Sequence, residues 1–293
     1  MMWQIPAKTF LLGEYAAIAE ESALIVTTTP CFTLEFIASA HLNEQIHPNS
    51  PAGLLWRKLN HKHFSLNWND PYQGIGGLGA SSAQFLGVYL AQCSQKNQTP
   101  RLFSMLSDYY TVAWSGKGLR PSGYDVIAQA QNRCVYINKK TGTIQSYDWT
   151  FKNLSFFLVH TGNKLPTHEH LQKIALPEIT PMLSACVDKA VHAMQSTDEQ
   201  LFISCVNHYH ELLTKFDLVT PASQKLIDAL RSYPEVIGAK GCGALGADIL
   251  LLLTAKSDAE AFNKKLRAEG YQVIAREDAI HTQSPLIPGH TLS

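Results

Sequence analysis

The segment with the clearest chemical potential is a glycine- and serine-rich stretch near position 80. Glycine lets several backbone N–H groups converge on one phosphate, because no side chain obstructs the approach. The following pattern predicts a helix, whose free N–H groups and positive dipole end would face the same anion. Its spacing matches neither a Walker A loop nor a dinucleotide fingerprint, and a tightly packed helix start is the alternative interpretation. The segment consists of Gly76, Gly77, Leu78, Gly79, Ala80, Ser81, Ser82 and Ala83.

A second segment places a lysine at the start of an apolar strand pattern. Lys8 follows Pro6 by two residues and precedes Thr9-Phe10-Leu11-Leu12. Burying a lysine costs several kcal/mol unless it is paired, so a functional lysine there needs a partner. A solvated lysine at a strand edge remains the alternative.

A third segment, Pro121 to Val126, combines a candidate helix cap with an acid. If Ser122 caps the helix, Asp125 lies in its first turn, where an acid also stabilises the helix dipole. The functional interpretation makes Asp125 a general base or the charge partner of a lysine.

A fourth segment, Gly238 to Asp248, contains four glycines within nine positions. We expect a flexible loop before the apolar strand at 248–253. It is either a tight connection between strands or a wall over the phosphates.

Elements of two kinds must position these segments. Short strands alternate with helices in the first half, whereas the second half reads strand, three helices, strand, helix, strand, which favours an α+β fold. We place a boundary near Asn153, giving domains 1–152 and 153–293. Strands are expected at 9–12, 24–28, 32–37, 134–137, 143–147, 156–160, 248–253 and 271–275. Helices are expected at 51–60, 80–93, 102–114, 124–131, 177–195, 198–215, 222–232 and 258–270.

The composition excludes several classes of partner. Lys+Arg and Asp+Glu both number 24, so the formal charge is 24 − 24 = 0, and no overall field favours nucleic acid or an anionic membrane. No apolar run approaches the ~20 residues needed to span a bilayer. The six cysteines show no C-x-x-C pair, and Met1 to Pro6 lacks the pattern of a secretion signal. We therefore expect a cytoplasmic protein with reduced thiols.

Taken together and in this order, the four segments resemble the GHMP kinase superfamily, which includes galactokinase, homoserine kinase, mevalonate kinase and phosphomevalonate kinase. The resemblance spans about residues 5–253, with Ala7, Ala80 and Leu245 replacing residues of the family pattern. The family's P-G-K and G-E-[HY] are matched by Pro6-Ala7-Lys8 and Gly13-Glu14-Tyr15. Its G-L-G-S-S-A is matched by Gly77 to Ser82, and its S-G-x-D by Ser122 to Asp125. Its K-x-x-G-A-G-x-G is matched by Lys240, Gly243, Ala244 and Gly246.

The mevalonate-pathway branch is the most similar. Gly13-Glu14-Tyr15-Ala16, Ser122 to Val126, Ser115-Gly116-Lys117 and the stretch Thr161 to Thr167 resemble phosphomevalonate kinases. Mevalonate kinase is the close rival, because Pro121-Ser122-Gly123 also matches its version. Diphosphomevalonate decarboxylase resembles the chain less, since it lacks the lysine of the first motif.

The resemblance implies a two-domain architecture, with an N-terminal ribosomal-S5-like α/β domain and a C-terminal ferredoxin-like α+β domain. It implies transfer of the γ-phosphoryl group of ATP, with Mg²⁺, to a small acceptor, phosphomevalonate being favoured over mevalonate. Lys8 and Asp125 would be catalytic, residues 76–83 would bind the ATP phosphates, and Ser81 would bind Mg²⁺. The expected substrate-binding residues are Glu14, Tyr15, Ser122, Gly123, Thr161, Lys164, Thr167, Gly243 and Gly246.

One departure concerns the metal. Mevalonate kinases carry a glutamate as a second Mg²⁺ ligand eleven residues before their aspartate, and Trp114 holds that position here. This departure, together with Ala7, Ala80 and Leu245, motivates an alternative in which the chain is a non-catalytic, ligand-binding homologue. A sugar or homoserine kinase is another. The sequence does not fix the oligomeric state, and a homodimer is one option.

Overall fold

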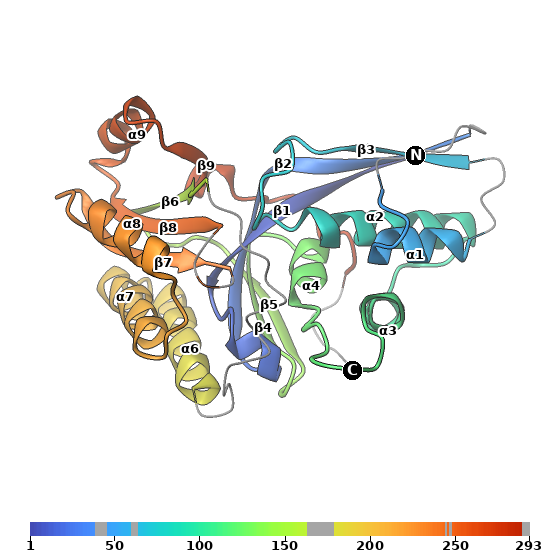
Figure 1. Ribbon diagram of the computed structural model, residues 1–293, viewed down its shortest axis with the longest axis horizontal. Helices are drawn as coiled ribbons and strands as arrows, with labels where there is room; N and C mark the ends of the chain where they lie inside the picture. The colour runs from blue at the N-terminus through green and yellow to red at the C-terminus, as the bar shows by residue number, and fades with distance from the viewer. Residues whose placement is uncertain (39–45, 60–63, 163–178, 244, 246–247, 289–293) are drawn as a thin grey trace.

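The computed structural model describes residues 1–38, 46–59, 64–162, 179–243, 245 and 248–288. They form two antiparallel sheets, one in each half of the chain, with helices packed around them (Figure 1). The α+β class expected from the sequence is confirmed.

The first sheet is built around one long strand, β2 (Ala23–Ala38). It pairs with β1 (Met2–Leu12) along one side, and with β4 (Cys134–Asn138) and β3 (Phe64–Asn69) along the other. β5 (Thr143–Tyr147) pairs antiparallel with β4 as a hairpin, and both strands lie at expected positions.

Two predictions about these strands were wrong. The expected strands 24–28 and 32–37 are one strand, because the register with β1 shifts between Ile5 and Ala7, opposite the segment that contains Pro30. Proline donates no ladder hydrogen bond, and such a bulge accommodates it without ending the strand. β3 was missed, since no strand was expected between 60 and 80.

Helices cover one side of the first sheet (Figure 1). Helix α2 (Ala80–Gln95) packs on β1 and β2, where Gly87 lies against Leu34 and Ile5, while the ring of Phe85 contacts that of Tyr109. Beside it lie α1 (Pro51–Arg57), α3 (Leu102–Ala113) and the short α4 (Tyr124–Ala130), all close to their predicted positions. A single 3₁₀ turn, η1 (Ala16–Ala19), connects β1 to β2.

The second sheet has the order β7-β8-β6-β9, formed by β6 (Leu154–His160), β7 (Val236–Cys242), β8 (Ile249–Ala255) and β9 (Gln272–Arg276). Alternate side chains face opposite sides, so Phe156 and Phe157 join two different buried clusters. One face packs against α6 (Thr180–Ser196) and α7 (Glu199–Lys215), and the other against α8 (Pro221–Arg231) and α9 (Ala259–Ala268).

The expected loop at 238–246 is in part a strand. Residues 238–242 belong to β7 and pair with β8. The glycines at 238 and 241 suggested flexibility, but Gly238 lies directly over the side chain of Leu253, and the sheet satisfies the backbone hydrogen bonds. Local composition was overridden by tertiary packing.

The two halves share contacts. The larger buried cluster contains Tyr15 from the first half and Tyr209 and Leu251 from the second. After the 3₁₀ turn η5 (Glu277–Ala279), the tail returns to the first half, where the Ile287 N–H donates to the Ala130 carbonyl at 3.2 Å. The sheets divide between Tyr147 and Leu154, and the domain boundary near 153 stays a prediction. In the part of the chain described, no helix combines the length and apolarity needed to cross a bilayer.

Candidate active site

The central feature of the site is an ion pair between two residues that the sequence singled out separately. The Lys8 ammonium lies 3.0 Å from a carboxylate oxygen of Asp125, so the pair joins the middle of β1 to the start of α4. The Lys8 side chain is 9% exposed and that of Asp125 is 40% exposed, so the pair is reached from solvent on the Asp125 side. Lys8 is therefore a partnered lysine in the interior, and the interpretation as a solvated strand-edge residue was wrong.

The glycine-rich segment lies directly against this pair. The Lys8 N–H donates to the Leu78 carbonyl at 3.0 Å. A side chain at Gly79 would come within 2.9 Å of Lys8 Cγ, and the residue has a φ of 82°, which also favours glycine. Gly79 thus serves close packing, and it is also the residue from which α2 begins, as the phosphate-loop hypothesis requires.

The two serines of the segment differ in environment. Ser81 is exposed at the first turn of α2. Ser82 is buried, and its hydroxyl donates to the side-chain oxygen of Gln129 at 2.6 Å. Of the two hydroxyls, Ser81 is thus the one that an outside ligand reaches, and Mg²⁺ binding by it stays a prediction.

Gln129 connects the separate segments and was missed by the sequence analysis. It is fully buried, and its amide nitrogen donates to the carbonyls of Pro6 at 2.8 Å and of Gly79 at 3.1 Å. Gln129 lies one helical turn after Asp125, so it shares a face of α4 with that residue. A glutamine in the largely apolar sequence of α4 could have been noticed, but its partners cannot be read from that pattern.

The turn before α4 differs in detail from the expectation. The residue that precedes the helix is Gly123, with a φ of 77°, and the Ser122 hydroxyl accepts from the Tyr124 N–H at 3.3 Å. The cap therefore lies one residue later than expected, and Asp125 is still in the first turn. The Ser122 carbonyl accepts a hydrogen bond from Tyr110 at 2.9 Å.

The second half contributes an acidic residue to the neighbourhood of the loop. A side chain at Gly77 would come within 2.8 Å of Asp248 Cβ, and one at Gly76 would lie 3.3 Å from an Asp248 carboxylate oxygen. A side chain at Gly243 would lie 3.5 Å from the other oxygen of the same carboxylate. Asp248 ends the fourth segment, for which a wall over the phosphates was one interpretation, but the residue itself was not singled out.

Two predicted substrate-binding residues have buried side chains. Glu14 forms an ion pair with Lys240, and both side chains are almost fully buried. Burial raises the pKa of the Glu14 carboxyl, an effect that the Lys240 ammonium opposes. The Tyr15 hydroxyl accepts from the Leu245 N–H at 3.0 Å, and burial raises its pKa to about 12. Glu14 and Tyr15 therefore join the first half to the β7 region, and a contact of either with substrate stays a prediction.

The remaining predicted positions are only partly described. The Thr161 N–H and hydroxyl both donate to the Asp248 carbonyl, at 3.2 and 3.3 Å. Lys164, Thr167 and Gly246 lie outside the described residues.

The position of the family's second metal ligand holds no acid. Trp114 follows α3, and its indole N–H donates to the Lys117 carbonyl at 3.1 Å. Among the described residues near the loop, the Ser81 hydroxyl and the carboxylates of Asp125 and Asp248 offer oxygen atoms of the kind that Mg²⁺ prefers, and metal binding by Ser81 stays a prediction.

Three solved structures are similar to the chain over nearly its whole length. The phosphomevalonate kinase of Streptococcus pneumoniae, in complex with phosphomevalonate and AMPPNP, is 17% identical and matches 94% of this chain and 99% of its own with a TM-score of 0.75. The mevalonate kinase of Methanococcus jannaschii is 18% identical, with coverages of 97% and 98% and a TM-score of 0.73. The galactokinase of Lactococcus lactis, complexed with galactose, is 12% identical, with coverages of 97% and 93% and a TM-score of 0.73. The chain has the GHMP kinase fold.

No family model matches the sequence, and no curated protein matches it significantly. The GHMP kinase fold is thus visible in the tertiary structure at an identity of 12–18% with these three proteins. These neighbours differ in acceptor, so the fold alone does not select one.

Proposed function

We propose that the chain is an ATP-dependent small-molecule kinase, a GHMP kinase that transfers the γ-phosphoryl group to an acceptor of the mevalonate pathway. The observation that carries the proposal is the Lys8–Asp125 pair, at 3.0 Å, lying directly against the glycine-rich start of α2. A cation, a carboxylate and a helix start beside glycines are the parts that phosphoryl transfer requires.

The division of work follows from charge. Negative charge develops on the phosphoryl oxygens during transfer, and the Lys8 ammonium is a positive charge held by surrounding structure. Asp125 fixes Lys8 and offers its more exposed carboxylate to the acceptor. For a hydroxyl acceptor, this carboxylate accepts the proton, a contribution typically worth about 10²–10⁴-fold. An acceptor that is already a phosphate needs no strong base.

Mg²⁺ would be held by hard oxygen ligands, and the exposed Ser81 hydroxyl with the Asp125 carboxylate fits that chemistry. When bound, the ion neutralises charge on the phosphates of ATP. Without a glutamate at position 114, we expect the phosphates and water to provide more of its ligands than in the family pattern.

We favour phosphomevalonate as the acceptor over mevalonate. The support is the resemblance of the Glu14-Tyr15, Ser122 to Val126 and Thr161 to Thr167 segments to phosphomevalonate kinases. A cytoplasmic location and a homodimer stay predictions of the sequence.

The test is an ATP-consumption assay with mevalonate, phosphomevalonate, homoserine and galactose as separate acceptors. We expect turnover with a mevalonate-pathway acceptor, highest with phosphomevalonate. Turnover with galactose or homoserine alone would contradict the proposed acceptor but would still support a kinase. ATP binding without turnover on any of the four would overturn the proposal in favour of a non-catalytic homologue.

A further inference from the structure

A second lysine, outside the motifs considered so far, holds the turn from which Asp125 is presented. Lys139 lies in the turn between β4 and β5, and its side chain is 9% exposed. Its ammonium lies 2.6 Å from Glu20 Oε1, 2.9 Å from the Tyr110 hydroxyl and 3.2 Å from the Ser122 carbonyl. An ammonium has three donors, so all three are used in this arrangement.

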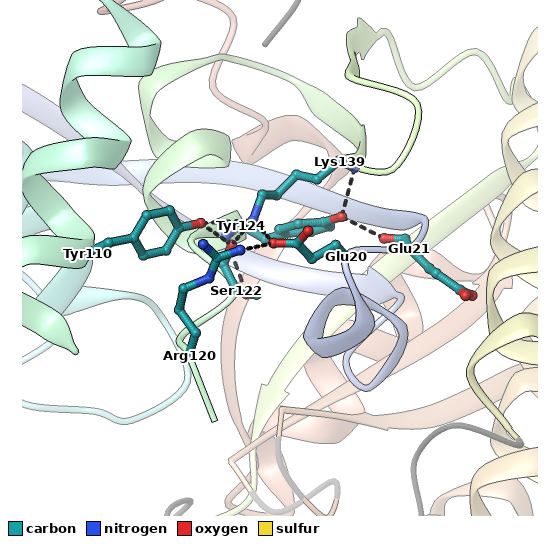
Figure 2. Close-up of polar contacts among 7 residues, drawn as sticks. All are labelled: Glu20, Glu21, Tyr110, Arg120, Ser122, Tyr124 and Lys139. Carbon is teal, nitrogen blue, oxygen red and sulfur yellow. Dashed lines mark hydrogen bonds and ion pairs between the residues drawn. The ribbon is translucent and has the colours of Figure 1, made fainter. Parts of the chain in front are cut away.

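The same cluster is closed by further contacts (Figure 2). Arg120 also binds Glu20, and its guanidinium lies over the Tyr110 ring at 4.6 Å. Partial burial would raise the pKa of the Glu20 carboxyl, but Lys139 and Arg120 together hold that pKa below its usual range. The Tyr124 hydroxyl donates to the Glu21 carbonyl at 2.8 Å and accepts from the Lys139 N–H at 3.1 Å. Four separate segments therefore meet at one point.

That point is the turn leading into α4. The Ser122 carbonyl accepts from both Lys139 and Tyr110, and a side chain at Gly123 would come within 2.7 Å of the Tyr110 hydroxyl. Because α4 has only seven residues, the position of its second residue, Asp125, depends strongly on how this turn is held.

We propose that Lys139 is a positioning residue, which fixes the Ser122–Gly123 turn and thereby the placement of the Asp125 carboxylate beside Lys8. Its role in turnover rests on the proposed kinase function, whereas its effect on the turn does not. A displacement of about 1 Å at a reacting group can cost on the order of 10²-fold in rate.

The adjacent residue provides a matched control. Lys140 carries the same charge and pairs with Glu21, but its side chain is 56% exposed and no contact joins it to the Ser122 turn among the interactions of the described residues. Lys139→Met and Lys140→Met remove the same charge from neighbouring positions, so a difference between them reports the contacts of Lys139 rather than net charge.

The first experiment measures amide hydrogen exchange in the full chain without ligands. Lys139→Met should raise the exchange rate at least tenfold in α4, including the Ile127 N–H that bonds to the Gly123 carbonyl at 3.1 Å. Exchange at the start of α2 should stay unchanged, and Lys140→Met should match the wild type in both places. Unchanged α4 exchange in Lys139→Met would overturn the proposal.

The second experiment measures kinetics with the acceptor that the wild type phosphorylates. Lys139→Met should lower kcat by about 10–100-fold with KM for ATP within twofold of wild type, because the phosphate loop is outside the cluster. Tyr110→Phe, which removes one of the two bonds to Ser122, should give a smaller loss. If Lys139→Met does not fold, Tyr110→Phe and Lys139→Arg carry the same comparison.

The two experiments separate the possible failures. A wild type without turnover on any acceptor overturns the proposed function, while the exchange result still decides the effect on the turn. A normal kcat in both Lys139→Met and Tyr110→Phe, with faster exchange in α4, would reject the role in positioning Asp125 for reaction. An equal loss of kcat in Lys139→Met and Lys140→Met would mean that the lost positive charge causes the effect, and it would also reject the proposal.

Discussion

Replacing Lys8 by methionine removes the cation from the centre of the site while keeping a similar apolar stem. The Lys8 side chain is only 9% exposed, so an effective dielectric constant of about 20 is appropriate, and a unit charge about 4 Å away then contributes about 4 kcal/mol. If that interaction forms fully only as charge develops on the phosphoryl group, its loss corresponds to about 10²–10³ in kcat.

The same substitution should leave the fold nearly unchanged. Asp125 is 40% exposed and stays hydrated when its partner is lost, so the free energy of unfolding should change by less than about 1 kcal/mol. ATP affinity, measured by calorimetry, should stay within about threefold, because the loop 76–83 is intact. Lys256→Met, which removes an exposed lysine paired with Glu277, is the charge control.

Comparing acceptors sharpens the test. With mevalonate, whose hydroxyl must lose a proton, Asp125→Asn should lower kcat by about 10²–10⁴-fold. With phosphomevalonate, the loss should be tenfold or less, while Lys8→Met remains severe with both. A Lys8→Met variant with near-normal kcat would remove Lys8 from the mechanism and refute the reasoning.

Three further predictions concern the surrounding structure. Gln129→Leu leaves the Pro6 carbonyl without its amide partner, so we expect a loss of about 1–3 kcal/mol in the free energy of unfolding, measured in urea, together with weaker ATP binding. Lys240→Met leaves the Glu14 carboxylate buried without its partner, so the free energy of unfolding should fall by about 3–5 kcal/mol by the same measurement. Burial, helped by the nearby cations Arg231 and Lys240, lowers the pKa of His210 to about 4. Since the unfolded chain binds this proton near pH 6.5, stability should fall as pH decreases from 6.5 towards 4, and His210→Asn should reduce that slope in denaturation curves.

Each of these has a result that contradicts it. Gln129→Leu with wild-type stability and ATP affinity would show that the amide does not join the loop to α4. Adding Glu14→Gln to Lys240→Met should recover part of the lost stability. No recovery would argue against an unpaired buried charge as the cause of the loss. Identical pH slopes for wild type and His210→Asn would mean that the ring is not the group that titrates.

Local sequence patterns were sufficient for most helices and for several strands. Helices α2 and α3 begin at the residues expected from their apolar periodicity, and the β4–β5 hairpin follows from two short β-rich runs around Lys140-Thr141-Gly142. The patterns failed where tertiary contacts decide. β7 contains glycines that suggested a loop, and β2 continues past Pro30 because its partner strand allows a bulge.

The candidate site shows the same division. The residue types at Lys8, residues 76–83 and Asp125 indicated the chemistry, since a lysine entering an apolar strand needs a partner and glycines before a helix suit an anion. Gln129, Asp248 and Lys139 were not recognised, because each acts through contacts with residues distant in the chain, and nothing in their immediate sequence reveals those contacts.

The sequence by itself determined which groups are available and which local element carries each: a cation on a strand, a glycine-rich helix start, and a carboxylate in the first turn of a short helix. These follow from short-range sterics, capping and periodicity. Only the tertiary structure decided that Lys8 and Asp125 form a pair, that Glu14 is bound to Lys240 in the interior, and that the α4 turn is held from the β4–β5 hairpin. Such pairings depend on the packing of two sheets and their helices, which no local window of sequence specifies.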